Sequence, residues 1–89
     1  MTAPDGELFQ FPTAFPLKVM GAAVPELRPR VLEIVARHAP GVRDEDVSLR
    51  VSSGGRYYAL SVTIQAESRA QLDALYRELT ACELVTMAL

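Results

Sequence analysis

The sequence has few of the residues on which disulfides, metal sites and nucleic-acid binding depend. It contains a single cysteine, Cys82, which excludes an internal disulfide or a CxxC metal site and fits a reducing, cytoplasmic setting. Nine basic side chains stand against eleven acidic ones, and the net charge of -2 has the wrong sign for binding nucleic acid through its phosphates. No stretch approaches the roughly 18 apolar residues of a membrane span. We therefore expect a cytoplasmic protein that binds neither nucleic acid nor membranes.

Length and composition predict one small folded domain. At 89 residues the chain has room for one hydrophobic core, and its 49% hydrophobic and 22% charged residues are the balance of an ordinary globular protein. Residues 1–7 are mostly polar and contain Pro4 and Gly6, so we expect a disordered leader without a packing role. We place the domain at residues 8–89.

Alternation of apolar and polar residues predicts strands in three segments. The alternation runs over residues 15–22, and again on both sides of a turn at Ser53-Gly54-Gly55-Arg56, from Val47 to Val51 and from Tyr58 to Ala66. The second and third segments predict a hairpin with one apolar face. Residues 83–89 are short, apolar and compatible with β-structure, and they predict a fourth strand.

Apolar residues spaced by three and four positions predict two helices. The first should begin near Pro25, because proline suits the first helical position, and should end before Pro40. Pro29 would clash with the carbonyl of Pro25 in one regular helix, so either the first turn is distorted or the helix starts late. Ser68 is a good N-cap for the second helix, which we place at residues 69–80.

The resulting order, βαββαβ, is typical of an α+β ferredoxin-like sandwich, with a four-stranded antiparallel sheet and both helices on one face. The first and third strands then lie in the centre, and their apolar side chains face the helices. The other face has no helix left to cover it, so we expect a partner subunit, a ligand or water there. We predict an interface on this face, which also carries Arg50, at Lys18, Met20, Tyr57, Ser61 and Thr63.

The turn between the first strand and the first helix is a second candidate site. A glycine there lets a small ligand or a second subunit approach the backbone, and the helix N-terminus behind it offers unpaired N–H groups. The alternative is that the glycine merely relieves a tight turn. Under the first interpretation the ligand contacts are Gly21, Val24, Glu26 and Leu27.

Residues that would support catalysis are scarce. The chain contains no asparagine, which argues against an acylphosphatase, and no CxxC follows the first strand, which argues against a metal-transfer domain. The only histidine, His38, has no evident acid–base partner, so we interpret it as a half-buried side chain at a helix C-terminus. We interpret the acidic runs Asp44-Glu45-Asp46 and Glu78 to Glu83 as solvated loops. We expect no enzyme, no cofactor and no metal.

Several motifs, in order along the chain, carry a resemblance to a known family. They are Phe11-Pro12-Thr13, Lys18-Val19-Met20-Gly21, Pro25-Glu26-Leu27, Arg37-His38-Ala39-Pro40-Gly41, Ser61-Val62-Thr63-Ile64, Leu75-Tyr76-Arg77-Glu78-Leu79 and Met87-Ala88-Leu89. From about Leu8 to Leu89 the sequence resembles the YbeD-like family of small bacterial proteins, which carries the label of a lipoate regulatory protein. The resemblance implies a fold similar to the ACT-type regulatory domains, a homodimer, and a ligand near residues 21–27.

These observations predict a non-catalytic regulatory or small-ligand-sensing module, whose link to lipoate metabolism is implied by the resemblance. Its partners would be a second copy of the chain, another protein or a small metabolite. The alternative is a protein–protein interaction adaptor that acts through the uncovered sheet face without a small ligand.

Overall fold

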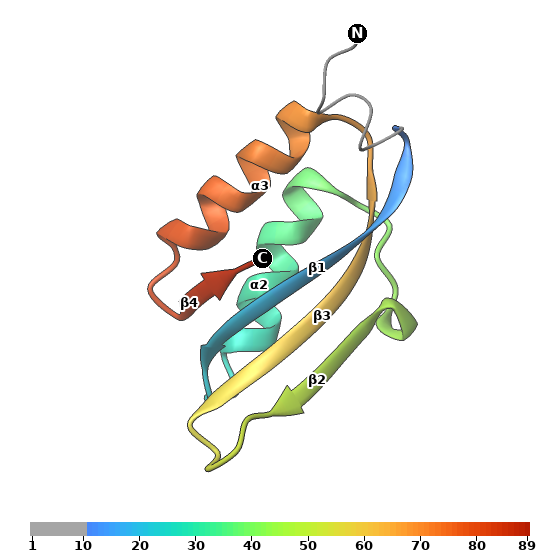
Figure 1. Cartoon of the computed structure of the whole chain (residues 1–89). Coiled ribbons are helices and arrows are strands. Elements are labelled where there is room, and N and C mark those ends of the chain that lie inside the picture. Colours follow the sequence, from blue (N-terminus) through green and yellow to red (C-terminus); the bar gives the residue numbers. More distant parts are fainter. Residues whose placement is uncertain (1–10) are drawn as a thin grey trace, which may run out of the picture.

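A computed structural model describes residues 11–89, and its element order is the predicted βαββαβ. The elements are β1 (Thr13–Ala22), α2 (Leu27–His38), a short 3-10 turn η1 (Asp44–Asp46), β2 (Val47–Val51), β3 (Tyr57–Ala66), α3 (Arg69–Ala81) and β4 (Val85–Ala88) (Figure 1). The expected leader at residues 1–7 and the expected domain start at residue 8 lie outside the described residues.

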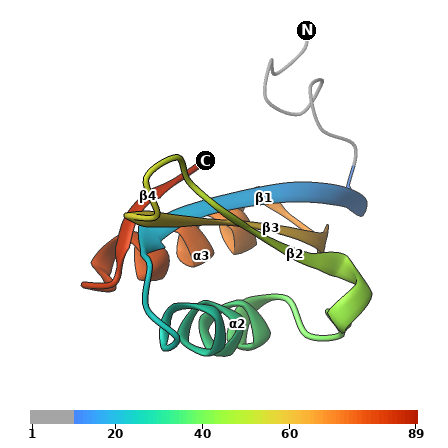
Figure 2. The ribbon, with the colours of Figure 1, turned by 90° about the horizontal axis from the view of Figure 1, so that it is seen from below.

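The four strands form one antiparallel sheet in the order β2-β3-β1-β4, so the two long strands β1 and β3 are central as predicted. Both helices lie on the same side of the sheet, and the opposite side carries no helix (Figure 2). The α+β ferredoxin-like architecture is therefore confirmed. In the register of the central pair, Leu17 lies opposite Val62 and Val19 opposite Leu60.

The hydrophobic core fills the space between the helices and the sheet. Residues directly opposite in antiparallel strands point to the same face, so the register directs the apolar alternation of β1 and β3 toward the helices. Burying a Leu or Val side chain stabilises the fold by about 1.5–3 kcal/mol. The largest fully buried side chains are Leu17, Val19, Leu27, Val31, Val35, Leu60, Val62, Ile64, Leu75 and Leu79.

The first helix begins at Leu27, so the expected start at Pro25 is wrong and the late start is right. The Leu27 N–H donates to the Val24 carbonyl at 3.1 Å in a turn that precedes the helix. Because Pro25 lies outside the helix, the ring of Pro29 has no helical carbonyl to clash with. Pro29 falls in the first turn, where its missing N–H would have had no acceptor.

The other boundaries differ from the expectations by a few residues. In the structure β1 starts at Thr13, α3 extends to Ala81, and β4 covers only Val85–Ala88 of the predicted segment. The predicted N-cap is confirmed, because the Ser68 hydroxyl accepts a hydrogen bond from the Gln71 N–H at 3.1 Å.

Candidate functional site

The uncovered face of the sheet presents side chains in rows that cross the strands. One row consists of Ser48, Ser61 and Lys18, which lie opposite one another on β2, β3 and β1. The next row consists of Arg50, Ala59 and Met20 on the same three strands. Met87 lies opposite Met20 and extends this second row onto β4.

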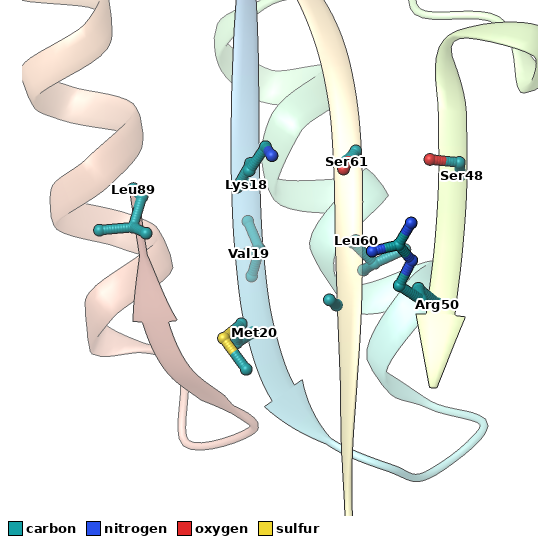
Figure 3. A pocket seen from close by; sticks show the side chains of 9 residues that line it. Lys18, Val19, Met20, Ser48, Arg50, Leu60, Ser61 and Leu89 are labelled. Atoms are coloured by element: carbon teal, nitrogen blue, oxygen red, sulfur yellow. The ribbon is translucent and has the colours of Figure 1, made fainter. Parts of the chain in front are cut away.

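A hollow of about 240 Å³ lies where these two rows meet. Ala59 contributes only a methyl group to its floor, whereas longer side chains from the neighbouring strands stand around it. Figure 3 shows these side chains. The lining residues are Lys18, Val19, Met20, Ser48, Arg50, Ala59, Leu60, Ser61 and Leu89.

Two cations reach into the hollow from opposite sides. Lys18 rises from β1 and Arg50 from β2, and in Figure 3 the nitrogen end of each is directed toward β3, which carries Ser61 between them. Within residues 11–89, neither cation forms an ion pair or a side-chain hydrogen bond. An ammonium, a guanidinium and two serine hydroxyls are the groups that proteins use to bind carboxylates and phosphates.

Apolar side chains border the hollow on its β4 side. Leu89 lies beside Lys18, because the two residues exchange backbone hydrogen bonds of 2.7 and 3.1 Å. The Leu89 residue is 65% exposed and Met87 is 47% exposed. The open face therefore combines a cationic centre with an apolar margin.

The five residues of the predicted interface all lie on this open face. Lys18, Met20 and Ser61 line the hollow, whereas Tyr57 and Thr63 lie outside its lining, opposite Ala22 and Pro16. Sequence reasoning placed Arg50 and Ala59 on the same face but did not name Ser48. The period of two along β2 would have identified Ser48, because it lies two residues before Arg50. The register then sets Ser48 beside Ser61 and Ala59 beside Arg50.

Packing accounts for the glycine at the second candidate site. A Cβ added at Gly21 would lie 2.3 Å from the Leu84 carbonyl oxygen and 2.7 Å from Leu27 Cδ1. Gly21 and Leu27 are both buried, Val24 is half-buried and Glu26 is exposed. The close approach of Leu84 and Leu27 requires the glycine, and a ligand role for Gly21, Val24, Glu26 and Leu27 stays a prediction.

His38 has a partner that the sequence did not reveal. Its Nε2 lies 2.6 Å from Glu78 Oε1, and the other carboxylate oxygen of Glu78 accepts a hydrogen bond from Arg37. The Gln71 side-chain amide also donates to the His38 carbonyl at 2.8 Å. Glu78 belongs to α3, so its interpretation as part of a solvated loop is wrong. The helical spacing of α3 turns Glu78 toward the C-terminal end of α2.

The electrostatics of this cluster explain its role in joining the helices. The hydrogen bond from Arg37, followed by that from His38, lowers the pKa of the Glu78 carboxyl below its ordinary value. The cluster lies on the helical layer, away from the open-face hollow. Within residues 11–89, no three His, Cys, Asp or Glu side chains are grouped closely enough to hold a metal ion.

None of the helices in the described part of the chain is long and apolar enough to cross a membrane.

Fold and surface together define a small α+β ferredoxin-like protein with a cation-lined hollow on its open sheet face. A family model described as "Protein of unknown function (DUF493)" matches residues 6–89, and the chain belongs to this family. A UPF0250 protein of Chromobacterium violaceum is 52% identical over 89 residues, which is 100% of both chains. The UPF0250 protein YbeD of Escherichia coli is 47% identical over 83 residues, 93% of each chain. The resemblance to the YbeD-like family is thereby confirmed.

Proposed function

We propose that this protein is a non-catalytic regulatory module that binds a small organic anion in the open-face hollow. The observation that carries the proposal is the convergence of Lys18 and Arg50 over β3 without an ion-pair partner in residues 11–89. A carboxylate or phosphate placed between them would gain charge-assisted hydrogen bonds from both, and the Ser48 and Ser61 hydroxyls would complete its contacts.

The apolar margin of the hollow indicates that the part of the ligand beyond its acidic group is apolar. With its acidic group between the two cations, a chain of several carbons could lie along Met20 and Leu89 toward β4. Medium-chain carboxylates such as octanoate and lipoate fit this description, and the lipoate label of the YbeD-like family makes them the first candidates. We place this activity in the cytoplasm, in keeping with the free thiol of Cys82.

The composition of the hollow supports binding rather than catalysis. Its lining includes two hydroxyls, from Ser48 and Ser61, but no histidine, carboxylate or thiol side chain that could activate them. The Lys18 and Arg50 side chains are both exposed, where a dissolved anion can reach them. A bound ligand would therefore be released chemically unchanged, as expected of a binding module.

Isothermal titration calorimetry with octanoate, lipoate and inorganic phosphate, and with neutral octanamide as the matched ligand, tests the proposal. We expect an anion to bind and octanamide not to bind. Lys18→Ala and Arg50→Ala should each weaken the affinity by about tenfold or more, which corresponds to about 1.4 kcal/mol. Arg30→Ala is the matched control, because it removes one positive charge from α2 on the other side of the sheet. An affinity unchanged in Arg50→Ala, or no binding of any anion, would contradict the proposal.

A protein–protein interaction adaptor is the second candidate, and the exposed apolar groups of the open face favour it. Tyr57 is 42% exposed on this face, and Met87 and Leu89 are exposed at the β4 margin of the face. Aromatic and Met side chains are enriched where proteins bind one another. The two candidates differ in one measurement. If the protein is an adaptor, a partner captured in a pull-down should be lost on Tyr57→Asp and retained on Lys18→Ala. If it is an anion-binding module, Lys18→Ala should abolish binding of the ligand.

A further inference from the structure

Strand β2 forms an edge of the sheet and leaves backbone groups unpaired (Figure 1). The Ser52 N–H donates to the Tyr57 carbonyl at 2.8 Å, and the pairing alternates from there along β2. Ser48 and Arg50 therefore direct their backbone groups toward β3, and Leu49 and Val51 direct theirs outward. Within residues 11–89, no hydrogen bond uses the outward groups of Leu49 or Val51.

The same two residues expose apolar side chains. Leu49 is 40% exposed and Val51 is 54% exposed, although both point to the helix side of the sheet, opposite Leu60 and Tyr58. The helical layer thus stops short of this edge. An edge strand with free N–H and C=O groups and an uncovered apolar row is a template for the addition of another strand.

Opposite charges lie at the two ends of β2. Before the strand, Asp44, Glu45 and Asp46 of η1 outnumber Arg43, although Asp44 and Glu45 form exposed ion pairs with Arg28 and Arg43 at 3.7 and 3.5 Å. After the strand, the hairpin tip carries Arg56. Arg56 has no ion-pair partner in the described part of the chain. A strand added antiparallel to β2 from an identical chain would bring Arg56 of each copy beside η1 of the other. This charge complementarity favours a second copy as the occupant of the edge.

We propose that two copies of the chain pair through antiparallel β2 strands about a twofold axis at Leu49. Leu49 then exchanges both backbone hydrogen bonds with the partner's Leu49, and the Val51 N–H donates to the partner's Val47 carbonyl. The reciprocal bond to the partner's Val51 carbonyl does not form, because the Val47 N–H already donates to the Asp44 carbonyl. The two sheets become continuous, all helices lie on one face, and the exposed side chains of Leu49 and Val51 are covered.

The charges on the open face favour an axis at Leu49 over an axis at Arg50. With the axis at Leu49, Ser48 lies opposite the partner's Arg50. With the axis one residue further on, Arg50 would lie opposite the partner's Arg50, and like charges directly opposite destabilise a sheet. Ser48 and Arg50 line the hollow, so pairing sets the two hollows side by side and places the partner's Arg50 at the rim of each. The pairing itself does not depend on the identity of the ligand.

Sedimentation equilibrium over a range of concentrations tests the association. We expect a dimer, with Leu49→Lys raising its dissociation constant by about tenfold or more through a buried charge. Met87→Lys is the matched control, because Met87 is similarly exposed on the opposite edge strand, and it should leave the dimer intact. A monomer at every concentration, or a dimer lost equally in both variants, would overturn the proposal.

A disulfide tests the register without relying on destabilised variants. In a Cys82→Ser background, Leu49→Cys should form an intermolecular disulfide under mild oxidation, because hydrogen-bonded antiparallel pairs have Cα atoms about 5.5 Å apart, within disulfide range. Met87→Cys in the same background should remain reduced. Failure of Leu49→Cys to cross-link while the protein is dimeric would show that the copies associate through another surface.

Discussion

The helix-covered face and the open face of the sheet take their side chains alternately from the same strands. Leu17 is completely buried under the helices, and the next residue, Lys18, is exposed at the hollow. On the covered face, shape decides which residue fits, because each side chain touches several others. On the open face, Lys18 and Arg50 are exposed and form no ion pair within residues 11–89, so packing places few demands on them. The covered face therefore determines stability, and the open face is where a change should alter binding alone.

Replacing adjacent residues of β1 should separate the two faces most clearly. Leu17→Ala leaves a cavity in the core and should lower the free energy of unfolding by about 3 kcal/mol. Lys18→Ala should change it by less than about 0.5 kcal/mol, because its side chain is at the surface. Urea denaturation of both variants measures the difference. If Lys18→Ala proved as destabilising as Leu17→Ala, the open face would have a structural role that the contacts do not explain.

A substitution at Gly21 tests whether packing or a ligand requires the glycine. Gly21→Ala should lower the free energy of unfolding by about 2 kcal/mol, because the new Cβ meets a backbone carbonyl that cannot move independently of β4. Gly54→Ala is the control, since its positive φ of 87° is strained for alanine but nothing lies within 4 Å, and we expect about 1 kcal/mol. If Gly21→Ala left the stability unchanged, packing would not explain the glycine, and the turn would again be a candidate ligand site.

The comparison of Gly21 with the strands shows what could be predicted from sequence. Element order and the two faces were predictable, because period-two and helical spacing are local properties of the chain. The contact between Gly21 and Leu84 was not, since it depends on a register irregularity between β1 and β4 at Met20 and Gly21. The start of helix α2 at Leu27 was one of the two outcomes that the spacing of Pro25 and Pro29 allowed, and the turn that precedes the helix decided between them.

The candidate site also has features that could be predicted from the sequence and features that could not. Alternation along β1 and β3 was sufficient to place Lys18, Met20 and Ser61 on the open face. The rows that set Ser48 beside Ser61 and Arg50 beside Ala59, and the convergence of Arg50 with Lys18, depend on the cross-strand register. Likewise, the pairing of His38 with Glu78 depends on how α2 packs against α3, which neither helix encodes alone.

Glu78 provides the smallest and most specific test, on the helical side of the sheet. Glu78→Gln removes the carboxylate that binds Arg37 and His38, and it should lower the stability near neutral pH by less than Gly21→Ala does, because the Glu78 side chain is 34% exposed. Glu33→Gln is the control, since Glu33 contacts Arg37 only at 3.6 Å on the surface of α2.

The pH dependence of the Glu78→Gln effect identifies its cause. The pKa of Glu78 is lower in the folded protein than its ordinary value of 4.5, so its contribution is fully present above pH 4.5 and is lost as the pH falls through the folded-state pKa. The stability difference between the wild type and Glu78→Gln should therefore shrink as urea denaturation is repeated below pH 4.5. A difference that stayed constant there would assign the effect to packing of the side chain, and the helical side would then lack an electrostatic link between α2 and α3.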